Sequence, residues 1–212
     1  MRNFSERKIL IILIMKEIKY PELEKKLLTG NEAITGTNNR LIDYWAWAHS
    51  MLVDNSERGI FAEFLVHTAM KSTETIRRNW TSYDILSPEG IKIEVKASGY
   101  IQSWGQEKLS PINFLIRPTQ VLNAEDNNFS GGKVRQADVY VFCVHTHTEQ
   151  ESINILDTSQ WKFYVLSTAT LNEKVGNQEK ISLTRLKALN PKETDYSGLR
   201  NAVLEAAGKL KI

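Results

Sequence analysis

The chain has 212 residues, of which 42% are apolar and one is cysteine, and its net charge at pH 7 is +2. This length and composition predict one domain with extensions and a substantial core. A single cysteine excludes an internal disulfide, which is ordinary for a reducing cytoplasm, the expected location. The small net charge does not by itself indicate a nucleic-acid binder, because such a protein must gather its basic residues on one face.

An apolar run, Ile9–Met15, follows a basic start. It is far shorter than the roughly 20 residues that span a bilayer, so we expect no membrane partner. Three interpretations stay open: a buried strand or helix start, sequence upstream of a translation start at Met15, and a membrane or export signal, for which no small-residue cleavage site follows. A short helix is predicted over residues 20–28. Residues 29–40, rich in Gly, Asn and Thr, are predicted to form a loop.

Residues 41–53 carry apolar side chains at helical spacing. Trp45, Ala48 and Leu52 would line one side of this helix. We expect its aromatic rings to pack against the domain, and base stacking is the alternative.

Asp54 is predicted to cap the next helix, Glu57–Lys71, with Glu57 three residues beyond the cap. Gly59 would let this helix approach a sheet closely, and Glu63 borders the core face one turn later. The predicted core face combines apolar residues with one threonine: Ile60, Phe61, Phe64, Leu65 and Thr68. A first strand is predicted over Thr73–Trp80.

Two short β-type runs then flank the turn signal Ser87-Pro88-Glu89-Gly90. Ser, Pro and Gly at these positions suit a type I turn, and such a turn followed by a residue at positive φ makes the commonest three-residue hairpin. This loop pairs Ser87 with Ile91 and places Asp84 opposite Glu94, with Cβ atoms roughly 5 Å apart.

Alternation along the second strand then puts Lys92, Glu94 and Lys96 on one face, opposite a core face of Ile91, Ile93 and Val95. Two neighbouring carboxylates repel one another unless a positive group lies between them. A hard divalent cation is the simplest candidate, because Mg²⁺ typically takes one or two carboxylates together with water and substrate phosphate. The Lys96 ammonium would hold an attacking water or stabilise charge that develops on a phosphate.

An Asp before the turn and Glu-Val-Lys after it resemble the PD-(D/E)xK nuclease superfamily, over roughly residues 57–144. Tyr83 stands where that family often has Pro. The resemblance implies a metal site for Mg²⁺, with Mn²⁺ as a substitute, that is formed by Asp84, Glu94 and the backbone carbonyl of Val95. Glu63 matches the acidic residue that the preceding helix often adds in this family.

Substrate contacts are expected on both sides of the hairpin. Arg77 and Arg78 are candidate phosphate contacts, with a solvated strand end as the alternative. The resemblance implies a polar residue just beyond Lys96, for which Ser98, Tyr100 and Gln102 are available, and Trp104 could stack on a base or sugar. The alternative is an ordered loop.

Residues 119–136 are predicted to form a long polar loop, and Lys133 and Arg135 would make it a flap that touches DNA. Residues 137–144 are almost continuously apolar, as in a strand buried on both faces at the centre of a sheet. His145 and His147 are expected at the exposed end of that strand, with a metal site as the alternative. Further strands are predicted over 112–117 and 161–167, and helices over 181–189 and 196–210.

Together these elements predict an α/β protein with a restriction-endonuclease-like core at residues 41–170, after an N-terminal extension at 1–40. Its mixed central β-sheet is flanked by helices and has the hairpin at its middle. Residues 171–212 would form a helical tail that packs on the core.

The expected function is Mg²⁺-dependent hydrolysis of phosphodiester bonds, in DNA by resemblance and in a restriction, repair or defence role. A homodimer would suit cuts in both strands of a duplex. The alternatives are a catalytically inactive nucleic-acid-binding module and a non-catalytic interaction protein on the same fold.

Overall fold

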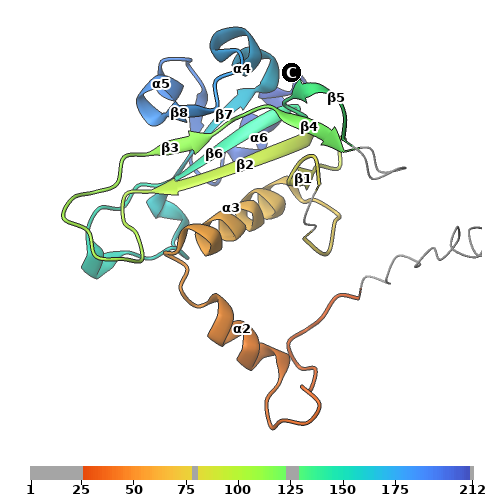
Figure 1. Cartoon of the computed structure of the whole chain (residues 1–212), viewed down its shortest axis with the longest axis vertical. Helices are drawn as coiled ribbons and strands as arrows, with labels where there is room; N and C mark the ends of the chain where they lie inside the picture. Colours follow the sequence, from red (N-terminus) through yellow and green to blue (C-terminus); the bar gives the residue numbers. More distant parts are fainter. Residues whose placement is uncertain (1–25, 78–80, 123–128, 211–212) are drawn as a thin grey trace, which may run out of the picture.

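The centre of the molecule is a five-stranded mixed sheet with the strand order β1-β2-β6-β7-β9 (Figure 1). The strands are Ile85–Leu86, Lys92–Gly99, Val139–His145, Trp161–Ser167 and Lys192–Thr194. β2 and β6 run parallel, and the other neighbouring pairs are antiparallel. The computed structural model describes residues 26–77, 81–122 and 129–210. The predicted α/β class with a mixed central sheet is confirmed.

β6 occupies the middle of this sheet, and all of its side chains are buried, as its apolar sequence predicts. Its alternate residues enter two separate cores, with Val141 in one and Phe142 in the other. The hairpin β1–β2 lies at one edge of the sheet, so the prediction that it forms the middle is wrong. The longest apolar run, and not the charged hairpin, takes the position that is covered on both faces.

The last residue of β6, His145, is buried and not exposed as expected. Its ring meets Trp161 edge-on at a centroid distance of 5.1 Å, and its Nε2 lies 3.4 Å from the carbonyl oxygen of Asn154. Burial disfavours the charged imidazolium and lowers the pKa of His145 to about 4. This histidine is therefore a neutral core residue.

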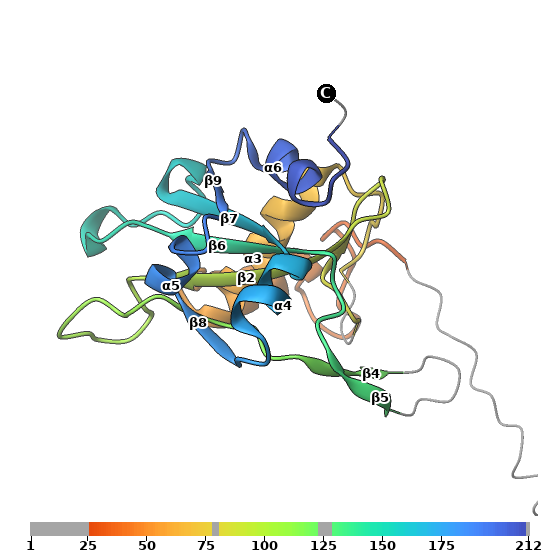
Figure 2. The same ribbon diagram turned by 90° about the horizontal axis from the view of Figure 1, so that it is seen from above.

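Helices α3 (Asn55–Met70) and α6 (Leu199–Ala206) cover one face of the sheet (Figures 1 and 2). The other face is covered by α4 (Thr168–Val175), α5 (Leu183–Lys187) and the antiparallel pair of β3 (Asn113–Leu115) with β8 (Lys180–Ser182). Two short 3₁₀ turns, Gln150–Ser152 and Thr158–Gln160, lie between β6 and β7. The C-terminal part thus adds a strand to the central sheet as well as the expected helices.

The predicted cap of α3 is confirmed, because the Asp54 carboxylate accepts the N–H of Ser56 at 2.9 Å. The predicted core face is wrong in part. Phe64 leaves 58% of its surface exposed, and Ile60 is exposed as well. The helix instead buries Arg58, Ala62, Leu65, Val66 and Met70. A Cβ on Gly59 would meet open space, so Ala62, and not Gly59, is the small residue against the sheet.

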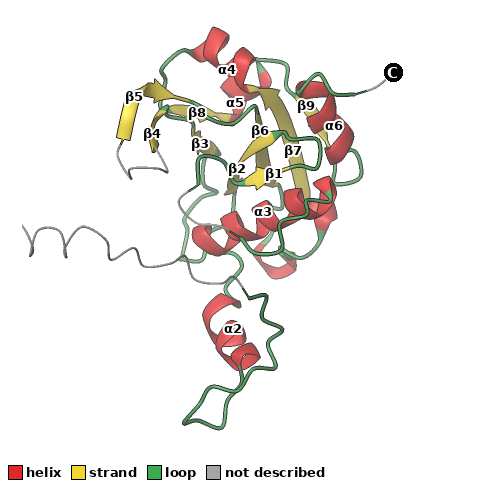
Figure 3. Cartoon of the chain, turned by 90° about the vertical axis from the view of Figure 1, so that its right-hand side faces the viewer, coloured by secondary structure: helices red, strands yellow, loops and turns green. Residues whose placement is uncertain are grey.

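Helix α2 (Leu41–His49) projects away from the body of the molecule (Figures 1 and 3). None of its residues is buried, and Trp47 leaves 84% of its surface exposed. The expectation that its aromatic rings pack on the domain is wrong, because helical spacing shows an apolar side but not what covers it. No helix among the described residues has both the length and the apolar character needed to cross a membrane.

Two further local predictions turn out differently where the structure describes their residues. Residues 73–77 form no strand, residues 26–28 form no helix, and Arg78 with the rest of the predicted first strand lies outside the described residues. The apolar run Ile9–Met15 also lies outside them. The predicted loop over 29–40 is confirmed and contains one isolated β-bridge.

The predicted loop over 119–136 is instead a two-stranded ribbon, β4 (Thr119–Leu122) paired antiparallel with β5 (Phe129–Val134). It extends beyond the edge of the main body (Figure 2). Polar composition suggested a loop, but two polar segments can satisfy their backbone groups by pairing with each other.

Candidate active site

The β1–β2 hairpin forms in the predicted register, with Ile85 opposite Ile93 and Leu86 opposite Lys92. Its turn is the predicted one, since the N–H of Gly90 donates to the Ser87 carbonyl at 2.9 Å and Gly90 has a φ of +79°. Gly90 is required there because other residues rarely adopt that conformation.

Asp84 lies immediately before β1, and the expected direct pairing with Glu94 does not form. The N–H of Asp84 donates to the carbonyl of Ile93 at 3.0 Å. Its carboxylate turns toward the edge of β2, where Oδ2 accepts the N–H of Val95 at 2.7 Å. The N–H and C=O of one strand residue point to the same edge, so the Val95 carbonyl also faces Asp84's side of the strand.

Glu94 and Lys96 lie side by side on one face of β2, as alternation predicts. Lys96 Nζ donates to Glu94 Oε1 at 2.6 Å, and both side chains are half-buried. The β2–β6 register places Tyr140 beside Glu94. Burial, and then the charge of Glu94, raises the pKa of the Tyr140 phenol, which therefore keeps its proton. Sequence reasoning missed this tyrosine because it lies within a run that reads as purely apolar.

The electrostatics of Asp84 show that the acids are close together. Burial raises the pKa of Asp84 to about 7, and the negative charges of Glu94 and then Glu63 raise it as well. The Val95 hydrogen bond and the Lys96 ammonium oppose this shift without cancelling it. The folded chain thus holds a carboxyl group whose charged form lacks a full counter-charge.

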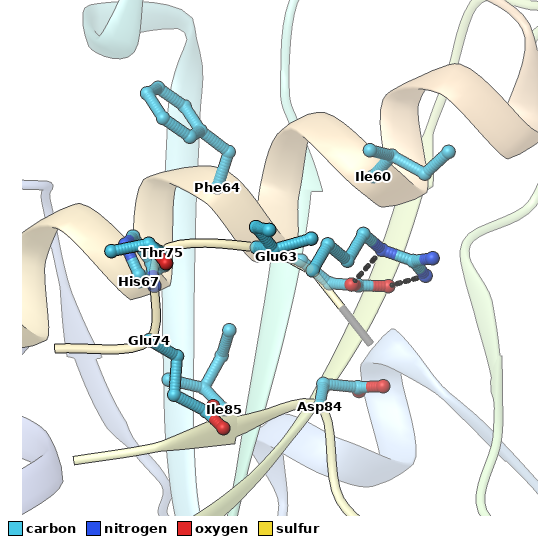
Figure 4. A pocket seen from close by; sticks show the side chains of 10 residues that line it. Ile60, Glu63, Phe64, His67, Glu74, Thr75, Asp84 and Ile85 are labelled. Carbon is cyan, nitrogen blue, oxygen red and sulfur yellow. Dashed lines mark hydrogen bonds and ion pairs between the residues drawn. The ribbon is translucent and has the colours of Figure 1, made fainter. Parts of the chain in front are cut away.

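Glu63 approaches from α3, across a pocket of about 210 Å³ that it lines together with Asp84 (Figure 4). Both of its carboxylate oxygens are engaged by Arg77, with Nε–Oε2 at 2.5 Å and Nη2–Oε1 at 2.8 Å. The exposed parts of Ile60 and Phe64 belong to the wall of this pocket, which explains why these residues are not in the core. Arg77, expected to contact phosphate, thus pairs with an acid of the site.

The donor set fits a hard divalent cation. Asp84 and Glu94 supply carboxylate oxygens, and the Val95 carbonyl supplies a further one at the same strand edge. Within the described ranges, no three His, Cys, Asp or Glu side chains converge closely enough to hold a metal by themselves. Two carboxylates completed by a carbonyl, water and phosphate are nevertheless the usual way in which proteins bind Mg²⁺.

The polar residues beyond Lys96 differ in their surroundings. Ser98 lies on β2, two residues after Lys96 and on the same face, and Tyr100 packs against the second core. Gln102 is buried, where its Nε2 donates to the Gly99 carbonyl at 2.9 Å and its Oε1 accepts from Arg58 at 3.2 Å. The structure does not support Gln102 as a substrate contact, because both ends of its amide are occupied. Trp104 is exposed, as stacking would require.

Arg58 connects this loop to the first turn of α3. It is buried and donates to the carbonyls of Val53 at 3.0 Å and Ile101 at 3.1 Å, as well as to Gln102. A Cβ on Gly99 would lie 3.0 Å from its guanidinium, so the end of β2 accommodates Arg58 by having a glycine. Gln102 and Arg58 therefore position the strand that carries Glu94 and Lys96.

Arg135 is also a structural residue and not the expected contact with DNA. Its guanidinium is buried and donates to the carbonyls of Ile116 at 2.8 Å, Gly176 at 2.7 Å and Gln178 at 3.1 Å, and to Oδ1 of Asn172 at 2.7 Å. Lys133, two residues earlier on β5, is exposed and lines a cleft at the base of the ribbon.

Replacing Arg135 with alanine is expected to lower the free energy of unfolding by about 3 kcal/mol, because four acceptors, one of them buried, lose a charged donor. Lys133→Ala, which removes an exposed cation two residues earlier, is expected to alter it by less than about 0.5 kcal/mol. Urea titration followed by circular dichroism measures both values. Equal stability of the two variants would contradict the structural role of Arg135.

No protein-family model matches this chain, and no curated protein does so either. The residues of the site itself therefore have to indicate the function.

Proposed function

We propose that this protein is a Mg²⁺-dependent nuclease that hydrolyses phosphodiester bonds, with DNA as its substrate, on a restriction-endonuclease-like core. The observation that carries the proposal is the grouping of Asp84, Glu94 and Lys96 around β2. Burial and the charge of Glu94 oppose the ionised form of Asp84, and the Lys96 amine lies 2.6 Å from Glu94. Such a group has little structural value by itself, because the burial of Asp84 opposes its own ionisation.

Asp84, Glu94 and the Val95 carbonyl are the residues that would hold the ion. Mn²⁺ would substitute for Mg²⁺, since both prefer oxygen ligands. When bound, the ion supplies Lewis-acid polarisation of the scissile phosphate. The Val95 N–H binds one oxygen of the Asp84 carboxylate and fixes its orientation, and the second oxygen would be the one to bind the ion.

Lys96 has a separate task in this proposal. Its ammonium is half-buried next to Glu94, which keeps it on the face of β2 where the phosphate would lie. From there it donates hydrogen bonds to the attacking water and to the phosphate oxygens as negative charge builds up on them. DNA, as opposed to RNA, is proposed from the resemblance of the motif.

The proposal is tested by incubating plasmid and linear DNA with the purified protein in the presence of Mg²⁺, Mn²⁺ or EDTA. We expect cleavage with either metal, none with EDTA, and none by the Asp84→Asn variant. Cleavage that survives both EDTA and Asp84→Asn would show that the chemistry lies elsewhere. A salt-dependent gel shift without cleavage would instead indicate an inactive binding module.

A further inference from the structure

The Glu63 carboxylate is already occupied by a cation from the chain itself. Arg77 binds it in a bidentate manner, at 2.5 Å and 2.8 Å. The Glu63 side chain is only 14% exposed, whereas Arg77 above it is 41% exposed. The arginine therefore covers the acid while keeping its own access to solvent.

Arg77 comes from a segment that has no regular secondary structure. Helix α3 ends at Met70, its cap Lys71 has a left-handed φ of 54°, and residues 73–77 belong to neither helix nor strand. No hydrogen-bonded ladder has to break for this segment to shift. Arg77 can thus leave Glu63 through a local rearrangement of this segment that breaks their ion pair and does not disturb the sheet.

Arg77 also lines the pocket to which the two acids contribute, so its positive group lies where acids from two elements face the same space. Both acids line the same pocket, with Glu63 above and Asp84 below (Figure 4).

We infer that Arg77 is an autoinhibitory stand-in for a metal ion, which withholds Glu63 from the site until a nucleic-acid phosphate draws the arginine away. This inference depends on the proposed function. A phosphate offers the guanidinium the same bidentate geometry as a carboxylate does. Glu63 does not converge with Asp84 and Glu94 while Arg77 holds it, and its release would let it turn across the pocket toward them as a third carboxylate. Phosphate binding and metal binding then favour each other, and by linkage the effect is equal in both directions.

The test measures Mn²⁺ binding by isothermal titration calorimetry, in the absence of nucleic acid. Arg77→Gln is expected to bind Mn²⁺ about tenfold more tightly than the wild type, because Glu63 becomes free to act as a ligand. Addition of a phosphorothioate oligonucleotide that resists cleavage is expected to tighten Mn²⁺ binding by the wild type and to leave Arg77→Gln unchanged.

Two variants distinguish the release of Glu63 as a ligand from a general effect of removing a positive charge. Arg117→Gln removes an exposed arginine from the cleft at the base of the β4–β5 ribbon and is expected to leave Mn²⁺ affinity unchanged. In a Glu63→Gln background, Arg77→Gln is expected to give no gain. A gain in that background, or equal affinity of wild type and Arg77→Gln, overturns the inference.

The outcomes also distinguish this inference from the proposed function. Tighter Mn²⁺ binding by Arg77→Gln without any DNA cleavage would support the stand-in role and reject the nuclease. Unchanged Mn²⁺ binding by Arg77→Gln together with Asp84-dependent DNA cleavage would reject the stand-in role and support the nuclease. A lack of Mn²⁺ uptake by every variant rejects both.

Discussion

Replacing Lys96 with methionine is expected to slow Mg²⁺-dependent DNA cleavage by about 100- to 1,000-fold. Methionine keeps the length of the side chain but removes the ammonium, which donates to Glu94 at 2.6 Å in the resting site. Loss of one positioned donor to developing negative charge typically raises the barrier by about 3–4 kcal/mol. Single-turnover cleavage of a labelled duplex at saturating protein measures the chemical step directly.

The matched control is Lys92→Met, which makes the same change on the same face of β2, four positions away from Lys96. Lys92 lies over the ring of Tyr83 and is exposed, so its loss is expected to change the rate by no more than a few-fold. Lys96→Arg should retain part of the activity, because it keeps the charge but not the shape. Similar rates for Lys96→Met and the wild type would remove Lys96 from the chemistry.

Asp84→Asn is expected to abolish cleavage and at the same time to stabilise the fold at pH 8, by about 2–4 kcal/mol. The pKa of Asp84 is about 7 in the folded chain, compared with its ordinary value of 3.8. Each unit of this difference corresponds to about 1.4 kcal/mol. The asparagine keeps an oxygen for the Val95 N–H but carries no charge that burial and the neighbouring acids oppose.

The difference in stability between the wild type and Asp84→Asn should increase as the pH rises. Between pH 4 and 7 the folded chain holds a proton on Asp84 that the unfolded chain has lost. Stability of the wild type therefore falls as pH rises through this window, and the full penalty is present above pH 7. Wild type and Asp84→Asn should be similar at pH 4 and furthest apart at pH 8, as measured by urea titration at each pH.

A second aspartate provides the control for this effect. Asp138 also accepts a β2 backbone N–H, that of Lys92 at 2.9 Å, but it is exposed. Asp138→Asn is expected to give no stabilisation at pH 8. Added Mg²⁺ should stabilise the wild type and not Asp84→Asn, because only the wild type regains the missing counter-charge. If the wild type were as stable at pH 8 as Asp84→Asn, the ionised Asp84 carboxylate would not be destabilising the fold.

The parts of this site that the sequence predicts well are local ones. The Ser87–Gly90 turn determines the register of its own hairpin, so the pairing of Leu86 with Lys92 follows from residues a few positions apart. The alternation that brings Glu94 and Lys96 together is a property of any strand. The apolar run in β6 likewise predicts its central place without knowledge of its neighbours.

The parts that sequence reasoning misses depend on contacts between distant elements. Nothing near Arg77 shows that it will meet Glu63 on a preceding helix, and nothing near Arg135 predicts three carbonyls from other segments. The rotation of α3 that exposes Phe64 follows from how Ala62 meets β2. An amphipathic pattern alone leaves that angle open, because α3 has apolar residues on more than one side.

The three-residue loop of the β1–β2 hairpin has a consequence for how this gene can change over time. Insertion or deletion of one residue between Leu86 and Lys92 would shift the strands past each other and send alternate side chains to the wrong face. Glu94 would then be buried against α3, and Ile93 would take its place. The ribbon β4–β5 stands apart from the core (Figure 2), so a change in the length of this ribbon should carry little penalty. Insertions and deletions should therefore be tolerated in the ribbon and selected against in the hairpin.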